Sequence, residues 1–337
     1  MSVDLPSVSI VVIGRNEEKN LNECFRSVLA IDYPKAKLEV IYVDTGSSDR
    51  SLEIAGKFNV KIVEERSDFP TPGLARNRGI QEAKNEVIHF VDGDMTVNRV
   101  YLKEAVSMLG KDNIACVIGG VSERRAHCNF FSRVLSHPWR SRKAGFKGAP
   151  GAGGTFLRNV LAELGGYHPE IRCGEETELG FRFIRAGYKI YMIDCEMGTH
   201  DYDVNTFFDL FMQSIMMGRS FGKILTLPPM PSYRDLRRRA KNIVIQGMLA
   251  LAIAFLLVAV RQPMFLLAIP VILAIYVMVR YRREYIGQWN WYALLYYMFM
   301  HLCKPLVFCG VLLYLICYLI RKFLIIDKVK GNYERDR

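Results

Sequence analysis

Two aspartates separated by a glycine, Asp92-Gly93-Asp94, are the residues of this sequence best suited to chemistry. They follow the apolar run 87–91, whose β-branched and aromatic residues indicate a buried strand. Open α/β sheets bind ligands just beyond the carboxyl ends of their strands, which is where these carboxylates are expected. Two hard oxygen ligands at this spacing suit Mg²⁺ or Mn²⁺ and a phosphate-bearing substrate, although a solvated Asp-Gly turn has the same composition.

Two earlier strands are also predicted to end in polar clusters. The run 8–13 ends at Gly14-Arg15-Asn16-Glu17, where Asn16 is a candidate helix N-cap, and the run 38–43 ends at Asp44. Strands alternating with helical segments predict βαβ units and a largely parallel sheet. Each cluster alone has the composition of a turn, but three clusters at one edge of one sheet favour a shared pocket.

Two later segments have both a structural and a functional interpretation. Glu175, Glu176 and Glu178 begin a predicted helix over 174–187, where the helix macrodipole favours acidic residues. This role at the helix start is the structural interpretation of the three glutamates, and a functional one follows from the resemblance described below. The basic segment 124–150 is either a solvated surface loop or a flap that covers an anionic ligand.

Six segments between residues 7 and 200 resemble, in order, the motifs of the family 2 glycosyltransferases. They are VSIVVIGRNEEKNL, VIYVDTGSSDRS, GLARNRGI, VIHFVDGDM, GTFLRN and GEETELGFRFIRAGY. The resemblance implies an α/β fold of the GT-A class, a Rossmann-like nucleotide-diphospho-sugar transferase domain over residues 1–203. It also implies an inverting hexosyltransferase that uses a nucleotide sugar, usually a UDP-sugar, and Mn²⁺ or Mg²⁺.

The resemblance assigns roles to individual residues. The nucleotide-sugar donor would be held by Gly14, Glu17, Asp44, Arg76 and Asp92. Asp44 would hydrogen-bond the base, and Asp92 would face the ribose and the metal. The metal ligands would be Asp92, Asp94 and His200.

Glu176 would be the catalytic base, at a position where the family usually has aspartate. In the family a second aspartate often follows the one that binds the nucleotide base, but here Asp44 is followed by Thr45. No Q-x-x-R-W motif of processive synthases is present, so we expect the enzyme to add one sugar per encounter. A hydroxyl nucleophile needs a base, whereas a phosphate nucleophile is already ionised. Glu176 therefore favours a hydroxyl on a lipid-linked saccharide or glycolipid, as in cell-surface polysaccharide synthesis; a polyprenyl-phosphate acceptor is the alternative.

The basic residues of this chain, whose net charge is +11, cluster beside long apolar stretches. That placement indicates that the basic residues face a membrane and do not bind nucleic acid, for which the sequence contains no binding motif. We predict interfacial amphipathic helices over 204–241 and a C-terminal helical membrane domain over 242–322. Its transmembrane spans are 243–260, 264–279 and 289–320, the last as one kinked or two short spans.

A basic cytosolic tail is predicted over 323–337, and the basic flanks predict a multi-pass protein of the inner or plasma membrane. The catalytic domain would then face the cytosol, with its thiols reduced. The expected partners are a nucleotide-sugar donor, a lipid-linked acceptor and membrane lipids. The sequence leaves open whether the chain forms a homo-oligomer.

Overall fold

The structure, a computed structural model, describes residues 5–124, 130, 134, 144–151, 153–201, 204–227, 234–259, 275–276, 298 and 303–335. Most of the predicted basic flap, 124–150, lies outside these residues. The chain divides into two compact units, Met1–Asp203 and Val204–Arg337.

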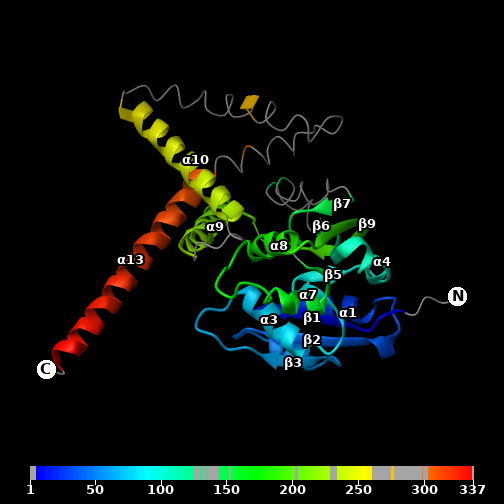
Figure 1. The fold of residues 1–337 in the computed structure, drawn as a ribbon. Helices are drawn as coiled ribbons and strands as arrows, with labels where there is room; N and C mark the ends of the chain where they lie inside the picture. Colours follow the sequence, from blue (N-terminus) through cyan, green and yellow to red (C-terminus); the bar gives the residue numbers. More distant parts are fainter. Residues whose placement is uncertain are drawn as a thin grey trace. The chain divides into compact units, whose positions relative to one another are not determined.

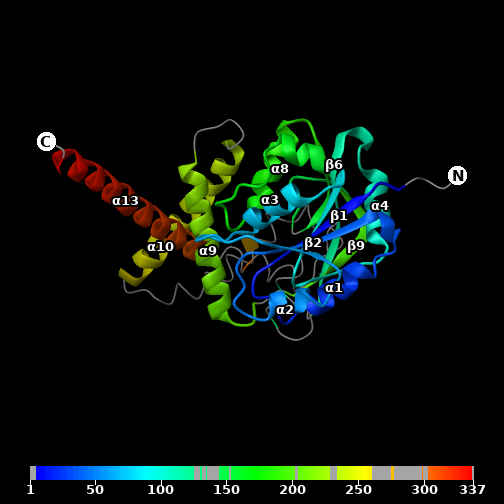
Figure 2. The same cartoon turned by 90° about the horizontal axis from the view of Figure 1, so that it is seen from below.

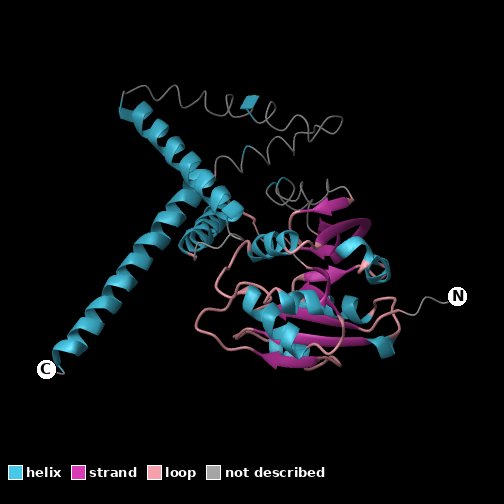
Figure 3. Ribbon diagram, viewed as in Figure 1, coloured by secondary structure: helices cyan, strands magenta, loops and turns pink. Residues whose placement is uncertain are grey.

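The first unit is built on one sheet of nine described strands (Figure 3). The strands are β1 (Val8–Gly14), β2 (Leu38–Asp44), β3 (Lys61–Glu64), β4 (Val87–Asp92), β5 (Met95–Val97), β6 (Ile114–Glu123), β7 (Gly145–Lys147), β8 (Gly154–Leu157) and β9 (Lys189–His200). Their order is β3-β2-β1-β4-β8-β6-β9-β5, with β7 paired to β9.

The helices of this unit alternate with the strands from β1 to β4 and less regularly after that (Figure 1). They are α1 (Leu21–Leu29), α2 (Ser51–Ala55), α3 (Pro72–Glu82), α4 (Tyr101–Met108), α7 (Arg158–Glu163) and α8 (Glu175–Arg185), with 3-10 turns at Lys35–Lys37 and Lys111–Asn113. Successive side chains of β1 point to opposite faces of the sheet, so Ile10 packs in one core and Val11 in the other. One core takes its helical residues from α1, α2 and α4, and the other from α3, α7 and α8 (Figure 2).

The prediction of a largely parallel sheet is correct for one half of it. Strands β3, β2, β1 and β4 are parallel, but β8 runs antiparallel to both β4 and β6, and β5 and β7 run antiparallel to β9. Only parallel neighbours require a crossover connection, and the strand-to-helix alternation that predicts crossovers is clear only in the first part of the sequence. The sheet is therefore mixed.

The second unit contains the helices α9 (Phe207–Thr226), α10 (Arg234–Ala259) and α13 (Lys304–Arg335). Helix α9 begins with a capping box in which Thr206 and Asp209 exchange side-chain-to-backbone hydrogen bonds. Helices α9 and α13 meet through glycines: a Cβ on Gly218 would lie 2.0 Å from the Val307 carbonyl oxygen, and one on Gly310 would lie 2.2 Å from that of Ile215. Glycine at both positions lets the two backbones touch.

The predicted membrane spans are only partly covered by described residues. Spans 243–260 and 289–320 overlap α10 and α13, while 264–279 lies outside the described residues except for 275–276. Helix α13 begins at Lys304, and Pro305 lies in its first turn, where proline is tolerated. Among the helices that are described, none combines the length and apolar character needed to cross a bilayer.

Candidate active site

The parallel register places three of the predicted polar clusters side by side. Gly14 pairs with Asp44 across β1 and β2, and Ile13 pairs with Asp92 across β1 and β4. The ends of the three strands therefore form one continuous edge, as the sequence predicted.

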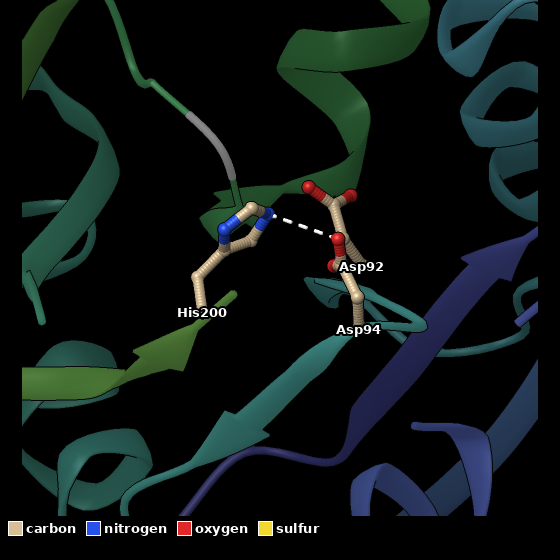
Figure 4. A group of neighbouring side chains, drawn as sticks. All are labelled: Asp92, Asp94 and His200. Atoms are coloured by element: carbon tan, nitrogen blue, oxygen red, sulfur yellow. Dashed lines mark ion pairs between the residues drawn. The ribbon is translucent and has the colours of Figure 1, made fainter. Parts of the chain in front are cut away.

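The three predicted metal ligands come together at this edge (Figure 4). Asp92 is the last residue of β4 and Asp94 directly precedes β5, which pairs antiparallel with β9 so that Met95 lies opposite His200. One ligand atom from each of Asp92, Asp94 and His200 lies within 4.8 Å of the others. His200 Nε2 is 3.1 Å from Asp94 Oδ2.

Two glycines make this convergence sterically feasible. A Cβ on Gly198 would lie 2.0 Å from the carbonyl oxygen of Thr96, so no larger residue fits where β9 approaches β5. A Cβ on Gly93 would lie 3.2 Å from the Ile13 carbonyl, to which the Gly93 amide donates a 2.8 Å hydrogen bond. Gly93 therefore allows the turn that contains Asp92 and Asp94 to pack closely against the end of β1.

The electrostatics of this group fit a divalent cation. Asp94 Oδ1 is buried and has no hydrogen-bond partner among the described residues, and a buried carboxylate oxygen normally has one. Burial alone lowers the pKa of His200, but the hydrogen bond to Asp94 and the charges of Asp94 and Asp92 raise that pKa to about 9. Two carboxylates and an imidazole gathered this closely are a donor set that Mn²⁺ and Mg²⁺ accept.

Asp44, the predicted base-binding residue, is fully buried and shapes its own turn. Its Oδ1 accepts hydrogen bonds from the amides of Gly46 (2.9 Å) and Ser47 (2.8 Å). Its Oδ2 accepts from the hydroxyls of Tyr42 and Ser47. Burial and the charge of Asp44 raise the pKa of Tyr42, which keeps that hydroxyl a donor. Contact between Asp44 and a base stays a prediction.

The segment after β1 is folded onto the segment after β2. The prediction that Asn16 caps the following helix is wrong: Asn16 has a φ of 60°, and its side chain accepts a hydrogen bond from the Ser48 amide. An asparagine adopts this left-handed conformation more readily than most residues, because its side chain can satisfy nearby backbone groups. The Glu17 amide donates to Ser51 Oγ at 2.8 Å, so both predicted donor-site segments are held together.

Arg76, predicted to help hold the donor, is buried and is 2% exposed. One of its terminal nitrogens lies 2.9 Å from Asp92 Oδ1, and the other lies 2.8 Å from Glu175 Oε1. Its guanidinium also stacks over the ring of Tyr167, 5.2 Å from the ring centroid. Through its contact with Asp92, Arg76 is linked to the predicted donor site, and the prediction that Arg76 itself helps to hold the donor stays a prediction.

The two glutamates that begin α8 differ in exposure. The Glu175 side chain is 4% exposed and is paired with Arg76, whereas the Glu176 side chain is 20% exposed and lies 3.8 Å from the same guanidinium. Burial and the charge of Glu176 raise the pKa of Glu175 to about 8. Of the two, Glu176 is the carboxylate available to an incoming molecule.

Sequence reasoning missed two residues at this edge, Glu175 as the partner of Arg76, and Arg124. The Arg124 guanidinium lies 3.0 Å from a Glu23 carboxylate oxygen and 3.4 Å from the backbone oxygen of Asp94. Neither residue shows a periodicity or spacing that points to the site. The signal that places Arg124 is the register of β6 with β9, in which Glu123 lies opposite His200.

Comparison with known proteins relates the first unit to a family. Residues 9–158 match the family described as "Glycosyl transferase family 2". Glycosyltransferase AglE of Haloferax volcanii is 34% identical over 129 residues, which cover 36% of this chain and 41% of AglE. Beta-monoglucosyldiacylglycerol synthase of Trichormus variabilis is 26% identical over 197 residues, covering 54% of this chain and 42% of the synthase. The chain thus spans less than half the length of these two relatives.

A solved structure shares the fold. The mannosyltransferase PcManGT from Pyrobaculum calidifontis, solved in complex with GDP-Man and Mn²⁺, aligns with a TM-score of 0.59 and 19% identity. The alignment covers 90% of this chain and 87% of that one. At this identity the likeness supports the fold, which is of the GT-A-like α/β class.

Proposed function

We propose that this protein, an enzyme with a family 2 glycosyltransferase domain of GT-A-like fold, transfers one sugar from a nucleotide-diphospho-sugar with inversion. A UDP-sugar is the expected donor and a hydroxyl group is the expected acceptor. One observation carries the proposal: Arg76 contacts Asp92, one of the three predicted metal ligands, and also lies near Glu176. Groups suited to the leaving diphosphate and to the attacking hydroxyl therefore occupy one site.

Each residue then has a definite task. Asp92, Asp94 and His200 would hold a divalent cation, which supplies positive charge against the departing diphosphate. Glu176 accepts the proton of the attacking hydroxyl, which is a poor nucleophile until that proton leaves. The turns after β1 and β2, which contain Gly14, Glu17 and Asp44, would position the nucleotide.

A glycolipid or lipid-linked saccharide is the acceptor class that we propose, in the assembly of cell-surface polysaccharide. Two features support it. The partly exposed Glu176 suits a hydroxyl acceptor, and one similar protein is named as a synthase of beta-monoglucosyldiacylglycerol, a product in which a lipid carries the sugar.

We further propose that the second unit attaches the enzyme to the inner or plasma membrane as a multi-pass protein, with the first unit in the cytosol. Its described helices expose many large apolar side chains, including Phe207 and Phe208 on α9, Met248 and Leu249 on α10, and Leu319 on α13. Such surfaces are rare on soluble monomers. If the protein instead leaves the membrane fraction under alkaline carbonate extraction, this attachment is disproved.

A screen of UDP-, GDP- and dTDP-sugars tests the activity. The full chain in nanodiscs is expected to release nucleoside diphosphate from one of them, with Mn²⁺ or Mg²⁺ and with a lipid-linked saccharide or glycolipid present. Asp94→Asn is expected to lower this release by about 10²-fold or more, since it removes one charge from the cation site. Release that continues unchanged in EDTA, or in Asp94→Asn, would refute the metal-dependent mechanism.

A further inference from the structure

The Arg76 guanidinium lies at the centre of three carboxylates from two separate elements. Asp92, at 2.9 Å, comes from the end of β4, while Glu175 at 2.8 Å and Glu176 at 3.8 Å come from the start of α8. Arg76 itself belongs to α3, and its 2% exposure leaves little of it for solvent or substrate. The Arg76 guanidinium therefore interacts with other side chains of the protein.

The first turn of α8 receives no side-chain cap hydrogen bond among the described residues. Its N-cap, Gly174, has a φ of 84° and offers no side-chain oxygen to the free amides of the first turn. Glu175 is the first helical residue, and it is tied to Arg76 while Glu176, the next residue, stays partly exposed. The ion pair of Glu175 thus anchors the turn that presents Glu176.

Only arginine suits this position. Its two terminal nitrogens bind Asp92 and Glu175 separately, and its flat face covers the ring of Tyr167 at 5.2 Å. Tyr167 is in turn held by Asn77, whose side-chain oxygen accepts a hydrogen bond from the Tyr167 amide and whose side-chain nitrogen donates to its carbonyl. A lysine ammonium is a point charge that cannot reproduce this planar fork.

We propose that Arg76 and Glu175 are positioning residues, which hold the donor-side carboxylate Asp92 and the base Glu176 in one fixed arrangement through a single buried guanidinium. This inference rests on the proposed glycosyl transfer for the roles of Asp92 and Glu176. It differs from the expectation that Arg76 holds the donor, because here Arg76 acts only through other side chains.

Substitutions at Glu175 can either keep or remove its contact with Arg76. Burial and the charge of Glu176 raise the pKa of Glu175 to about 8, against the opposing effect of Arg76. A glutamine at 175 has nearly the size of glutamate and keeps a side-chain oxygen that accepts a hydrogen bond from Arg76. A leucine of similar size removes that oxygen and leaves the guanidinium without one partner.

The experiment compares Arg76→Lys, Glu175→Gln and Glu175→Leu in the full chain, with Arg78→Lys as the matched control. Arg78 lies on the same helix, is 38% exposed, and pairs with Glu82 at 2.8 Å. The first readout needs no activity: hydrogen exchange of the Glu178 amide, which donates to the Gly174 carbonyl at 3.0 Å in the first turn of α8. We expect exchange about tenfold faster in Arg76→Lys and Glu175→Leu, and unchanged in Glu175→Gln and Arg78→Lys.

The second readout separates positioning from donor binding. With the donor that the wild-type enzyme uses, Glu175→Leu should lower kcat by about 10- to 100-fold with little change in donor KM, since a misplaced base slows the chemical step. Arg76→Lys should lower kcat by a similar factor, and any rise in donor KM should accompany that loss, because Asp92 is displaced too. Glu175→Gln should retain most of the activity.

Two results would overturn the inference. Exchange of the Glu178 amide equal to wild type in Arg76→Lys and Glu175→Leu would show that the ion pairs do not anchor α8, whether or not the protein is active. A rise in donor KM at constant kcat in Arg76→Lys would show that Arg76 binds the donor directly. If the Glu178 amide exchanges faster in these two variants but the wild-type protein transfers no sugar, the ion pairs do anchor α8 and the proposed function is refuted instead.

Discussion

Glu176 is the residue on which the choice of acceptor depends. Its carboxylate is the more exposed of the pair that begins α8, at 20% against 4% for Glu175. For a hydroxyl acceptor, Glu176→Gln should lower kcat by about 10²- to 10⁴-fold, because glutamine cannot take the proton. Calorimetric titration with the donor should show unchanged affinity. Near-normal turnover in Glu176→Gln would favour a phosphate acceptor, which needs no base.

Single residues also show where sequence reasoning reaches its limit. The roles of Asp92, Asp94 and His200 came from a resemblance, and their proximity depends on the pairing of β5 with β9, which join residues about a hundred positions apart. The burial of Arg76 has no local signal at all, because it arises only when β4 and α8 bring their carboxylates to α3.

At the scale of elements, the contact of β5 with β9 depends on Gly198. Gly198→Ala would bring a methyl group to within 2.0 Å of the Thr96 carbonyl oxygen, so the two strands must separate. We expect a loss of about 1–3 kcal/mol in the free energy of unfolding and weaker Mn²⁺ binding, since His200 is carried by the same strand. Chemical denaturation and a Mn²⁺ titration measure the two effects.

Gly148→Ala is the control for that substitution, because a Cβ there would have no heavy atom within 4 Å. Gly148→Ala should change neither the free energy of unfolding nor the affinity for Mn²⁺. Equal stability of Gly198→Ala and wild type would contradict the packing of β5 against β9 described above.

His89 on β4 gives the fold a dependence on pH. Its side chain is buried, with Nδ1 3.1 Å from Thr155 Oγ1 and 3.2 Å from the Gly154 carbonyl, and burial lowers its pKa from 6.5 to about 4. Between these two values the unfolded chain binds a proton that the folded chain does not, so stability is lost as the pH falls from about 6.5 to about 4.

The contribution of His89 reaches about 3 kcal/mol at the acid end of this range, at about 1.36 kcal/mol per pKa unit. His89→Gln should therefore show a smaller decline in unfolding free energy over the same range, as measured by urea denaturation at several pH values. Parallel declines in the two proteins would mean that His89 is protonated in the folded state.

The predictions for elements succeeded where the sequence pattern is local. The strands ending near Gly14, Asp44 and Asp92 follow from apolar runs that break into polar turns, and all three lie at one edge. The mixed half of the sheet was not predictable in this way, because the antiparallel neighbours of β8 and β9 are chosen by non-local pairing.

At the scale of the whole chain, the described helices of the second unit meet at glycines and expose several large apolar side chains. Gly218 and Gly310 lie in the contact of α9 with α13, whereas Leu313 and Leu319 of α13 are exposed. Gly218→Val should push the two helices apart and destabilise their contact by about 1–3 kcal/mol. Faster hydrogen exchange over 207–226 is the expected result.

Leu313→Val, on the exposed side of α13, is the matched control and should leave that exchange unchanged. Equal exchange in Gly218→Val and in wild type would contradict the close approach of the two helices. The sequence predicted helices in this unit, but which face of α9 packs against α13 follows from the glycine contacts rather than from apolar periodicity.

The central claim is that Asp92, Asp94 and His200 form one divalent-cation site that serves the nucleotide sugar. The most direct measurement is a Mn²⁺ titration of the full chain followed by electron paramagnetic resonance, with wild type and Asp94→Asn in parallel. One bound Mn²⁺ per chain is expected in the wild type, with binding weakened about tenfold or more in Asp94→Asn. Equal Mn²⁺ binding by the two proteins, or none by the wild type, would contradict the claim.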